Sequence, residues 1–155
     1  MGRGNERLFT RAAAGALGGG AGAFAMSRVP VLRRVDDRTT ALISQAAAER
    51  LLHRPLTRRR LDRAIPFIRY GYGTMAGAAY GLFTDNSSAV FTGSVLTGAA
   101  WGALLWVVSD WVVLPALASV PPRDEAGRTA LSLVAHLIYG VATALVAHSI
   151  RTSAT

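Results

Sequence analysis

The distribution of charged residues constrains the fold of this chain more than any other feature. Residues 12–27, 86–109 and 129–147 contain no Asp, Glu, Lys or Arg, whereas residues 28–69 hold 11 of the 17 basic residues. A lipid bilayer requires long uncharged spans separated by charged loops, and a soluble fold does not. The pattern therefore predicts an all-α integral membrane protein that forms one membrane domain over residues 1–155.

Four segments are apolar and long enough to cross a hydrocarbon core of about 30 Å at about 1.5 Å per residue. These predicted transmembrane helices cover residues 9–28, 67–84, 89–111 and 127–150. The first segment contains three consecutive glycines and barely reaches across the core, so it needs neighbouring helices. Pro115 is expected to bend or end the apolar run that the third segment begins.

The basic loop 29–66 contains a helical pattern at residues 36–54, with acids at its start, arginines towards its end and Pro55 as a stop. We expect an amphipathic helix that lies outside the core, at the membrane interface. The arginines flank apolar spans and lack interleaved aromatic residues. Anionic lipid headgroups are therefore favoured as their partner, and nucleic acid is not.

The arginines also indicate an orientation in the membrane. A cytoplasmic first loop places 13 Arg inside and 4 outside, with both termini outside, and the positive-inside rule favours that choice. Arg3, Arg7 and Arg11 argue the other way, and a first helix that crosses incompletely would remove the conflict. We expect a multi-pass protein of the bacterial cytoplasmic (inner) membrane.

Small residues recur at helical spacing in three places. Gly73, Gly77 and Gly81 form a double GxxxG pattern; Gly98 and Gly102 form a second ridge, and glycines of residues 15–22 form a third. In lipid, such ridges let helix backbones pack closely. Their partners are either other helices of this chain, in a compact bundle, or a second copy in a homo-oligomer.

A faint internal repeat accompanies these ridges. Residues 15–30 resemble residues 98–115, and the Tyr-Gly pairs of the second span resemble Tyr139-Gly140 in the fourth. The repeat has two explanations, a duplicated two-helix unit or chance similarity between helices rich in Gly and Ala.

Several ionisable residues are expected at similar depth on one side of the bundle. Asp110 lies near the end of the third span, and His136 lies about 10 Å into the fourth. Arg28 closes the first span, Arg69 opens the second, and Tyr139 follows His136 by about one turn. Asp110 then either sits among lipid headgroups, forms a structural polar pair with Arg28, Arg69 or His136, or belongs to a proton or solute site.

Other chemistry has little support in the sequence. The chain has no cysteine, and His53, His136 and His148 are not spaced to share a helix face as metal or haem ligands would. Neither a nucleophile elbow, a phosphate-binding glycine loop nor a carboxylate dyad is present. We therefore expect no enzyme activity, no metal site and no cofactor.

Four stretches together resemble the YagU-like family of bacterial inner-membrane proteins: residues 21–34, the Tyr- and Gly-rich second span, residues 91–122 and residues 135–140. The resemblance covers about 90 residues and implies a helical inner-membrane protein. It singles out His136, within Ala135-His136-Leu137, and supplies no substrate. Residues 35–66 and Asp110 depart from the family pattern.

The sequence is compatible with two functions, of which it favours the first. The first is a structural or accessory membrane protein that binds a partner, because the signals found are for helix packing and lipid contact. The alternative is a subunit of a proton or small-solute transporter or channel that acts as an oligomer, because four short helices enclose little volume.

Overall fold

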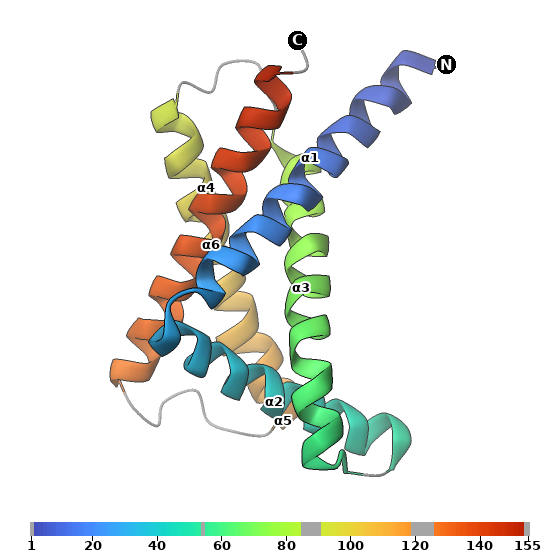
Figure 1. Cartoon of the computed structure of the whole chain (residues 1–155), viewed down its shortest axis with the longest axis vertical. Coiled ribbons are helices and arrows are strands. Elements are labelled where there is room, and N and C mark those ends of the chain that lie inside the picture. The colour runs from blue at the N-terminus through green and yellow to red at the C-terminus, as the bar shows by residue number, and fades with distance from the viewer. Residues whose placement is uncertain (1, 54, 85–90, 119–125, 154–155) are drawn as a thin grey trace.

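The structure is a computed structural model that describes residues 2–53, 55–84, 91–118 and 126–153. Every regular element among these residues is a helix, which confirms the predicted all-α fold (Figure 1). In chain order the elements are α1 (Gly2–Ser27), α2 (Pro30–Leu52), α3 (Arg58–Phe83), α4 (Phe91–Trp106), the π-helix η1 (Val107–Val113), α5 (Leu114–Ala118) and α6 (Ala126–Ser153).

Helix α1 is the centre of the bundle. It packs against α3 on one side and α6 on the other, and α6 in turn packs against α4. The short α5 continues the line of α4 through η1, and α2 runs across the end of the bundle, where it contacts α3, α5 and α6. The two chain termini lie at the opposite end (Figure 1).

Two helices of the described chain are long and apolar enough to cross a membrane. They cover Gly93–Ala116, with a mean hydropathy of 1.5, and Thr129–Ser153, with a mean hydropathy of 1.9. Length and composition alone are a weak indication, because the core helix of a soluble protein meets the same criteria. The other two predicted spans lie within α1 and α3, whose arginines lower their hydropathy.

The basic loop contains a helix, as predicted, but it begins earlier than residue 36. Helix α2 starts at Pro30, after an extended Val29, and ends at Leu52; His53, which follows, has a left-handed φ of 51°. Proline suits the first turn of a helix because its missing N–H would have no partner there. Helix α3 also begins earlier than the predicted span 67–84, at Arg58. Pro66, which directly precedes that span, therefore lies inside the helix.

Pro115 neither ends nor sharply interrupts the third apolar helix, which continues to Ala118. The chain widens into the π-helix η1 immediately before it, where the Leu114 N–H donates to the carbonyl oxygen of Ser109, five residues back. A proline cannot donate to the residue four positions back, and its ring crowds that carbonyl. A wider turn accommodates both effects, and π-turns of this kind occur often at functional sites.

The glycine ridge of α3 faces the first helix. A Cβ atom built on Gly77 would lie 2.6 Å from the Cα of Gly19, and one built on Gly15 would lie 2.8 Å from the Cα of Gly81. The backbones of α1 and α3 therefore touch along this ridge. Small residues permit this close approach, which brings many atoms of the two helices into van der Waals contact.

A second set of glycines, on α1 and α4, faces α6. A Cβ atom on Gly22 of α1 would meet the carbonyl oxygen of Tyr139 at 2.6 Å, and one on Gly98 of α4 would meet that of Gly140 at 2.6 Å. Gly102 lies against the backbone of His136 and Leu137. All three glycine ridges are thus occupied by helices of the same chain, as the compact-bundle interpretation requires.

Replacing Gly77 by Ala should destabilise the bundle, because the new methyl group forces α1 and α3 apart. We expect a cost of about 1–3 kcal/mol, typical of overpacking. Gly71→Ala on the same helix is the matched control, since nothing lies within 4 Å of a Cβ atom there. Thermal unfolding in detergent should show a lower Tm for Gly77→Ala only; equal melting temperatures for the two variants would contradict this packing.

Candidate functional site

A cavity of about 190 Å³ lies at the α2 end of the bundle, between α2, α3, η1 and α6. Apolar side chains make most of its wall, and polar groups are grouped on one part of it. It is lined by Val35, Asp36, Thr39, Thr40, Ile43, Ile68, Arg69, Tyr72, Val108, Ser109, Val113, Ser132, Ala135 and His136. An apolar cleft with a few convergent polar groups is the usual form of a small-molecule site.

Arg69 is the charged centre of this cavity, and its partners come from α2. Its Nε donates to the Asp36 carboxylate at 2.6 Å, and its Nη2 pairs with the carboxylate of Asp37. The Arg69 side chain is only 8% exposed. The guanidinium is therefore neutralised from the loop segment, which sequence reasoning had placed outside the core. The expected Arg69–Asp110 pair is not formed, because α2 folds back against α3 and supplies nearer acids.

Asp110 and His136 meet through a serine. The Ser132 hydroxyl donates to the Asp110 carboxylate, at 3.1 Å from each oxygen, and the His136 ring nitrogen Nδ1 lies 2.9 Å from the Ser132 carbonyl oxygen. A carbonyl oxygen can only accept, so Nδ1 is the donor. Asp110 and His136, which were predicted to lie at similar depth, both contact Ser132 of α6 and form no direct hydrogen bond with each other.

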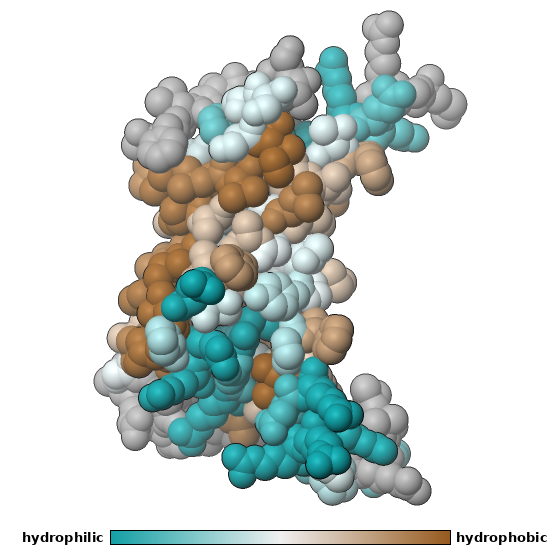
Figure 2. All heavy atoms as spheres, viewed as in Figure 1, coloured by the Kyte–Doolittle hydropathy of each residue, from teal (hydrophilic) through white to brown (hydrophobic). Residues whose placement is uncertain are grey.

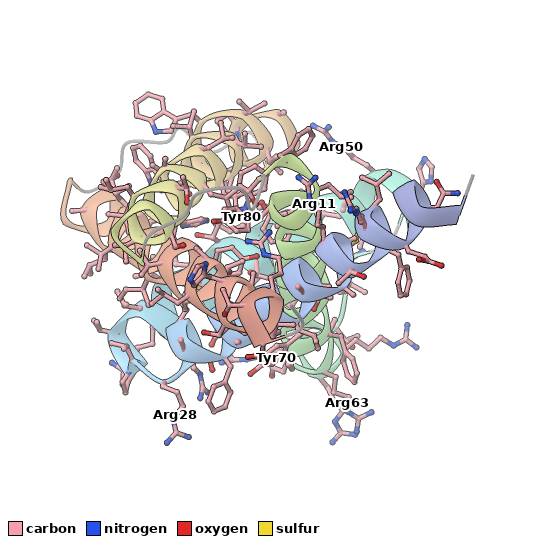
Figure 3. The ribbon with its side chains drawn as sticks, turned by 90° about the horizontal axis from the view of Figure 1, so that it is seen from above. Arg11, Arg28, Arg50, Arg63, Tyr70 and Tyr80 are labelled. Atoms are coloured by element: carbon pink, nitrogen blue, oxygen red, sulfur yellow. The ribbon has the colours of Figure 1, made fainter. Side chains whose placement is uncertain are left out.

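Arg28 is not part of the site. It lies in the turn between α1 and α2, points away from the bundle in Figure 3 and is exposed, with its guanidinium carbon 5.6 Å from the centre of the Phe24 ring. Arg28, one of the three partners considered for Asp110, does not pair with it in the described structure, because α1 ends at Ser27 and the chain turns into α2 there. An exposed guanidinium over an aromatic face keeps its hydration and needs no carboxylate.

Tyr139 is buried and bonded to another element. Its hydroxyl donates to the Gly73 carbonyl oxygen at 2.6 Å, which links α6 to α3. It lines a second cavity, of about 30 Å³, together with Asp36, Arg69, Tyr72 and His136. This small cavity adjoins the larger one through those shared residues. Tyr139 therefore borders the site, but its hydroxyl already donates a hydrogen bond that joins α6 to α3.

Tyr72 connects the site to the π-helix. Its hydroxyl lies 3.4 Å from the Ser109 hydroxyl of η1, so α3 and η1 meet beside the cavity. Sequence reasoning did not assign Tyr72, Ser132, Asp36 or Asp37 to a site. A signal existed for the two acids, because they are the only adjacent carboxylates of the first loop, at the start of its helical pattern.

The described residues offer little for covalent or metal chemistry. No group of three or more His, Asp or Glu side chains that could hold a metal ion occurs in the parts of the chain that the structure describes. What the arrangement can do is hold a small, largely apolar molecule and form hydrogen bonds with it at one end. No family model, curated protein or solved structure matches this chain.

Arg69→Gln should destabilise the protein strongly, because it leaves the Asp36 and Asp37 carboxylates without their cation. Removing one member of a buried ion pair costs about 3–5 kcal/mol. Arg28→Gln is the matched control: both residues were predicted for one polar cluster, but an exposed side chain should change stability by less than about 0.5 kcal/mol. Chemical unfolding in detergent measures both, and comparable losses would show that Arg69 has no special role.

Proposed function

We propose that the chain is a multi-pass membrane protein in which α1, α3, the continuous helix from α4 to α5, and α6 all cross the bilayer. The degree of burial supports this proposal. Only 11% of the apolar window in Gly93–Ala116 is buried inside the structure, and 39% of that in Thr129–Ser153. A core helix of a soluble protein would be mostly buried, whereas a helix in lipid keeps apolar side chains on its outer surface.

The outer surface of α1 and α3 supports the same arrangement. Phe9, Phe67 and Phe83 are each at least 76% exposed, and Met75 is 75% exposed. Figure 2 shows hydrophobic residues over the middle and upper part of the molecule, and hydrophilic residues gathered at the α2 end and near the N-terminus. A contiguous exposed apolar surface with polar residues at its two ends fits a bilayer better than water.

We propose further that two similar helix pairs build the bundle. In the pair α1–α3, Gly15 and Gly19 pack against the backbone of Gly77, while Gly98 and Gly102 pack against Gly140 in the pair α4–α6. Both pairs therefore pack two glycines, four residues apart on one helix, against a glycine of the other helix. This supports the duplicated two-helix unit over chance similarity.

The exposed arginines support an orientation. Arg58, Arg59, Arg60 and Arg63 all lie exposed in the first turns of α3, beside α2. We propose that this end faces the cytoplasm and anionic lipid headgroups, with both termini outside, in a bacterial inner membrane. The YagU-like resemblance is compatible with that location and stays a prediction.

Within that framework, we propose that the protein binds a small solute in the cavity and serves as a transporter or channel subunit. The observation that carries this proposal is the cavity itself, with Arg69, Asp36, Ser132 and His136 on an otherwise apolar wall. A hydrogen-bonded chain of Asp110, Ser132 and His136 occupies one end of the bundle only. The site therefore suits a solute better than a proton relay across the membrane.

An accessory role is the second candidate, and one observation favours it. The outward face of α4 and η1 carries exposed Leu96, Leu104 and Val112 side chains, which a partner helix or another copy of the chain can cover as well as lipid can. An accessory protein has no need for a ligand in the cavity. Solute binding by the purified chain alone therefore distinguishes the two candidates.

Cysteine labelling tests the membrane arrangement, because the chain has no cysteine of its own. Thr57→Cys lies in the segment between α2 and α3, and Ser153→Cys lies at the end of α6. In intact bacterial cells with a permeable outer membrane, an impermeant maleimide should label only Ser153→Cys; permeabilising the inner membrane should expose Thr57→Cys. Labelling of both residues in intact cells, or none of the protein in membranes, would overturn the arrangement.

Filling the cavity tests the solute site. Ile43→Trp places an indole in the cavity wall, whereas Val31→Trp adds the same group to an exposed face of α2 outside it. Benzyl alcohol is the probe, measured by equilibrium dialysis against the full chain in zwitterionic nanodiscs. Wild type and Val31→Trp should bind it above the level of empty nanodiscs, and Ile43→Trp should bind at least about tenfold more weakly. Equal uptake by all samples would contradict the proposal that the cavity binds a small solute.

A further inference from the structure

His136 brings a ring nitrogen to the wall of the cavity. Because Nδ1 donates to the Ser132 carbonyl, Nε2 of the neutral ring carries a lone pair and can only accept a hydrogen bond. No residue in the described part of the chain gives Nε2 a partner. His136 lines both the larger and the smaller cavity. The cavity wall thus carries a hydrogen-bond acceptor to which no described residue donates.

The charges around the cavity leave an excess of negative charge. Asp36 and Asp37 share the buried guanidinium of Arg69, and Asp37 also lies 3.5 Å from the Nε of the exposed Arg33. Asp110 accepts two contacts from the Ser132 hydroxyl, and no Arg lies within ion-pair distance of it among the described residues. Asp36 and Asp37 are thus paired with arginines, and Asp110 contributes the negative charge beside the cavity that no described arginine balances. In a site of low dielectric such an excess attracts a positive ligand and repels an anion.

Arg69 cannot serve as an anion receptor while both carboxylates hold it. Its Nε and Nη2 atoms face Asp36 and Asp37, whose charges already balance the guanidinium and repel an anionic ligand. The opposite wall of the cavity is apolar, with Ile43, Val108 and Val113. A bound molecule must therefore have an apolar body as well as its polar group.

We propose that the cavity binds a small organic ammonium ion, with its N–H groups directed to His136 Nε2 and the Asp36 carboxylate. Its hydrocarbon part lies against the apolar wall. This inference rests on the proposed solute-binding function and names the class of solute. A dry cavity of about 150 Å³ holds one benzene molecule, so a cavity of about 190 Å³ accommodates an amine with a single ring.

Three probes of one shape and different charge test the proposal: benzylammonium, benzyl alcohol and benzoate. Each is dialysed against the full-length wild type in zwitterionic nanodiscs, with Ile43→Trp as the measure of uptake by lipid alone. We expect benzylammonium to bind at least about tenfold more tightly than benzyl alcohol, and benzoate to bind no better than the blocked variant.

The outcomes separate the class of solute from the function. Binding of benzyl alcohol as tight as that of benzylammonium, or preferred binding of benzoate, overturns the ammonium proposal and leaves the solute site intact. Uptake of all three probes equal to that of Ile43→Trp overturns both. The ranking of the three probes uses the wild type alone and does not depend on whether Ile43→Trp folds; empty nanodiscs give a second measure of uptake by lipid.

A charge-neutralising variant adds a second measurement. Asp110→Asn keeps an acceptor for the Ser132 hydroxyl and removes one negative charge next to the cavity. It should weaken benzylammonium binding several-fold and leave benzyl alcohol binding unchanged. Asp62→Asn, on the exposed side of α3 and outside this cavity, makes the same change in net charge and should have no effect. Equal losses in the two variants overturn the proposed contribution of Asp110.

Discussion

The contact of helix backbones across α1 is the constraint on which the rest of the structure depends. Two glycine ridges on this helix, one with Gly15 and Gly19 and one with Gly18 and Gly22, face α3 and α6 respectively. Because the ridges are three residues apart, they lie on adjacent faces of the helix. A chain with larger residues at these positions would separate α3 from α6, and the Tyr139 hydroxyl would no longer reach the Gly73 carbonyl.

The position of α2 follows from where α1 ends. The turn after Ser27 sends α2 across the end of the bundle, so that Asp36 and Asp37 meet Arg69 on α3. Asp36 and Arg69 together form part of the cavity wall. The basic loop 29–66 thus also supplies the acids that neutralise the buried Arg69. The site is built as much by the loop helix as by the four long helices.

Much of the helical framework was predictable from the sequence, because it depends on local patterns. The described residues of the predicted spans lie in α1, α3, the run from α4 to α5, and α6, apart from Arg28 and Thr84 just beyond two helix ends. Residues 89–90 of the third span lie outside the described residues. Uncharged windows and helical spacing of small residues predict such helices without knowledge of the partner. The starts of α2 and α3 were predicted too late. Pro30 begins one helix and Pro66 lies within the other, and a proline alone does not distinguish these two positions.

The sequence by itself determined that this chain is helical, with glycine ridges and long uncharged stretches along its helices, since both properties arise from residues within a few positions of each other. Only the tertiary structure decided which acid neutralises Arg69, that Ser132 joins Asp110 to His136, and that Arg28 stays outside. These choices depend on how α2 folds back and on the wide turn before Pro115. Contacts between residues far apart in the chain are fixed by the packing of whole helices, and no local pattern records that packing.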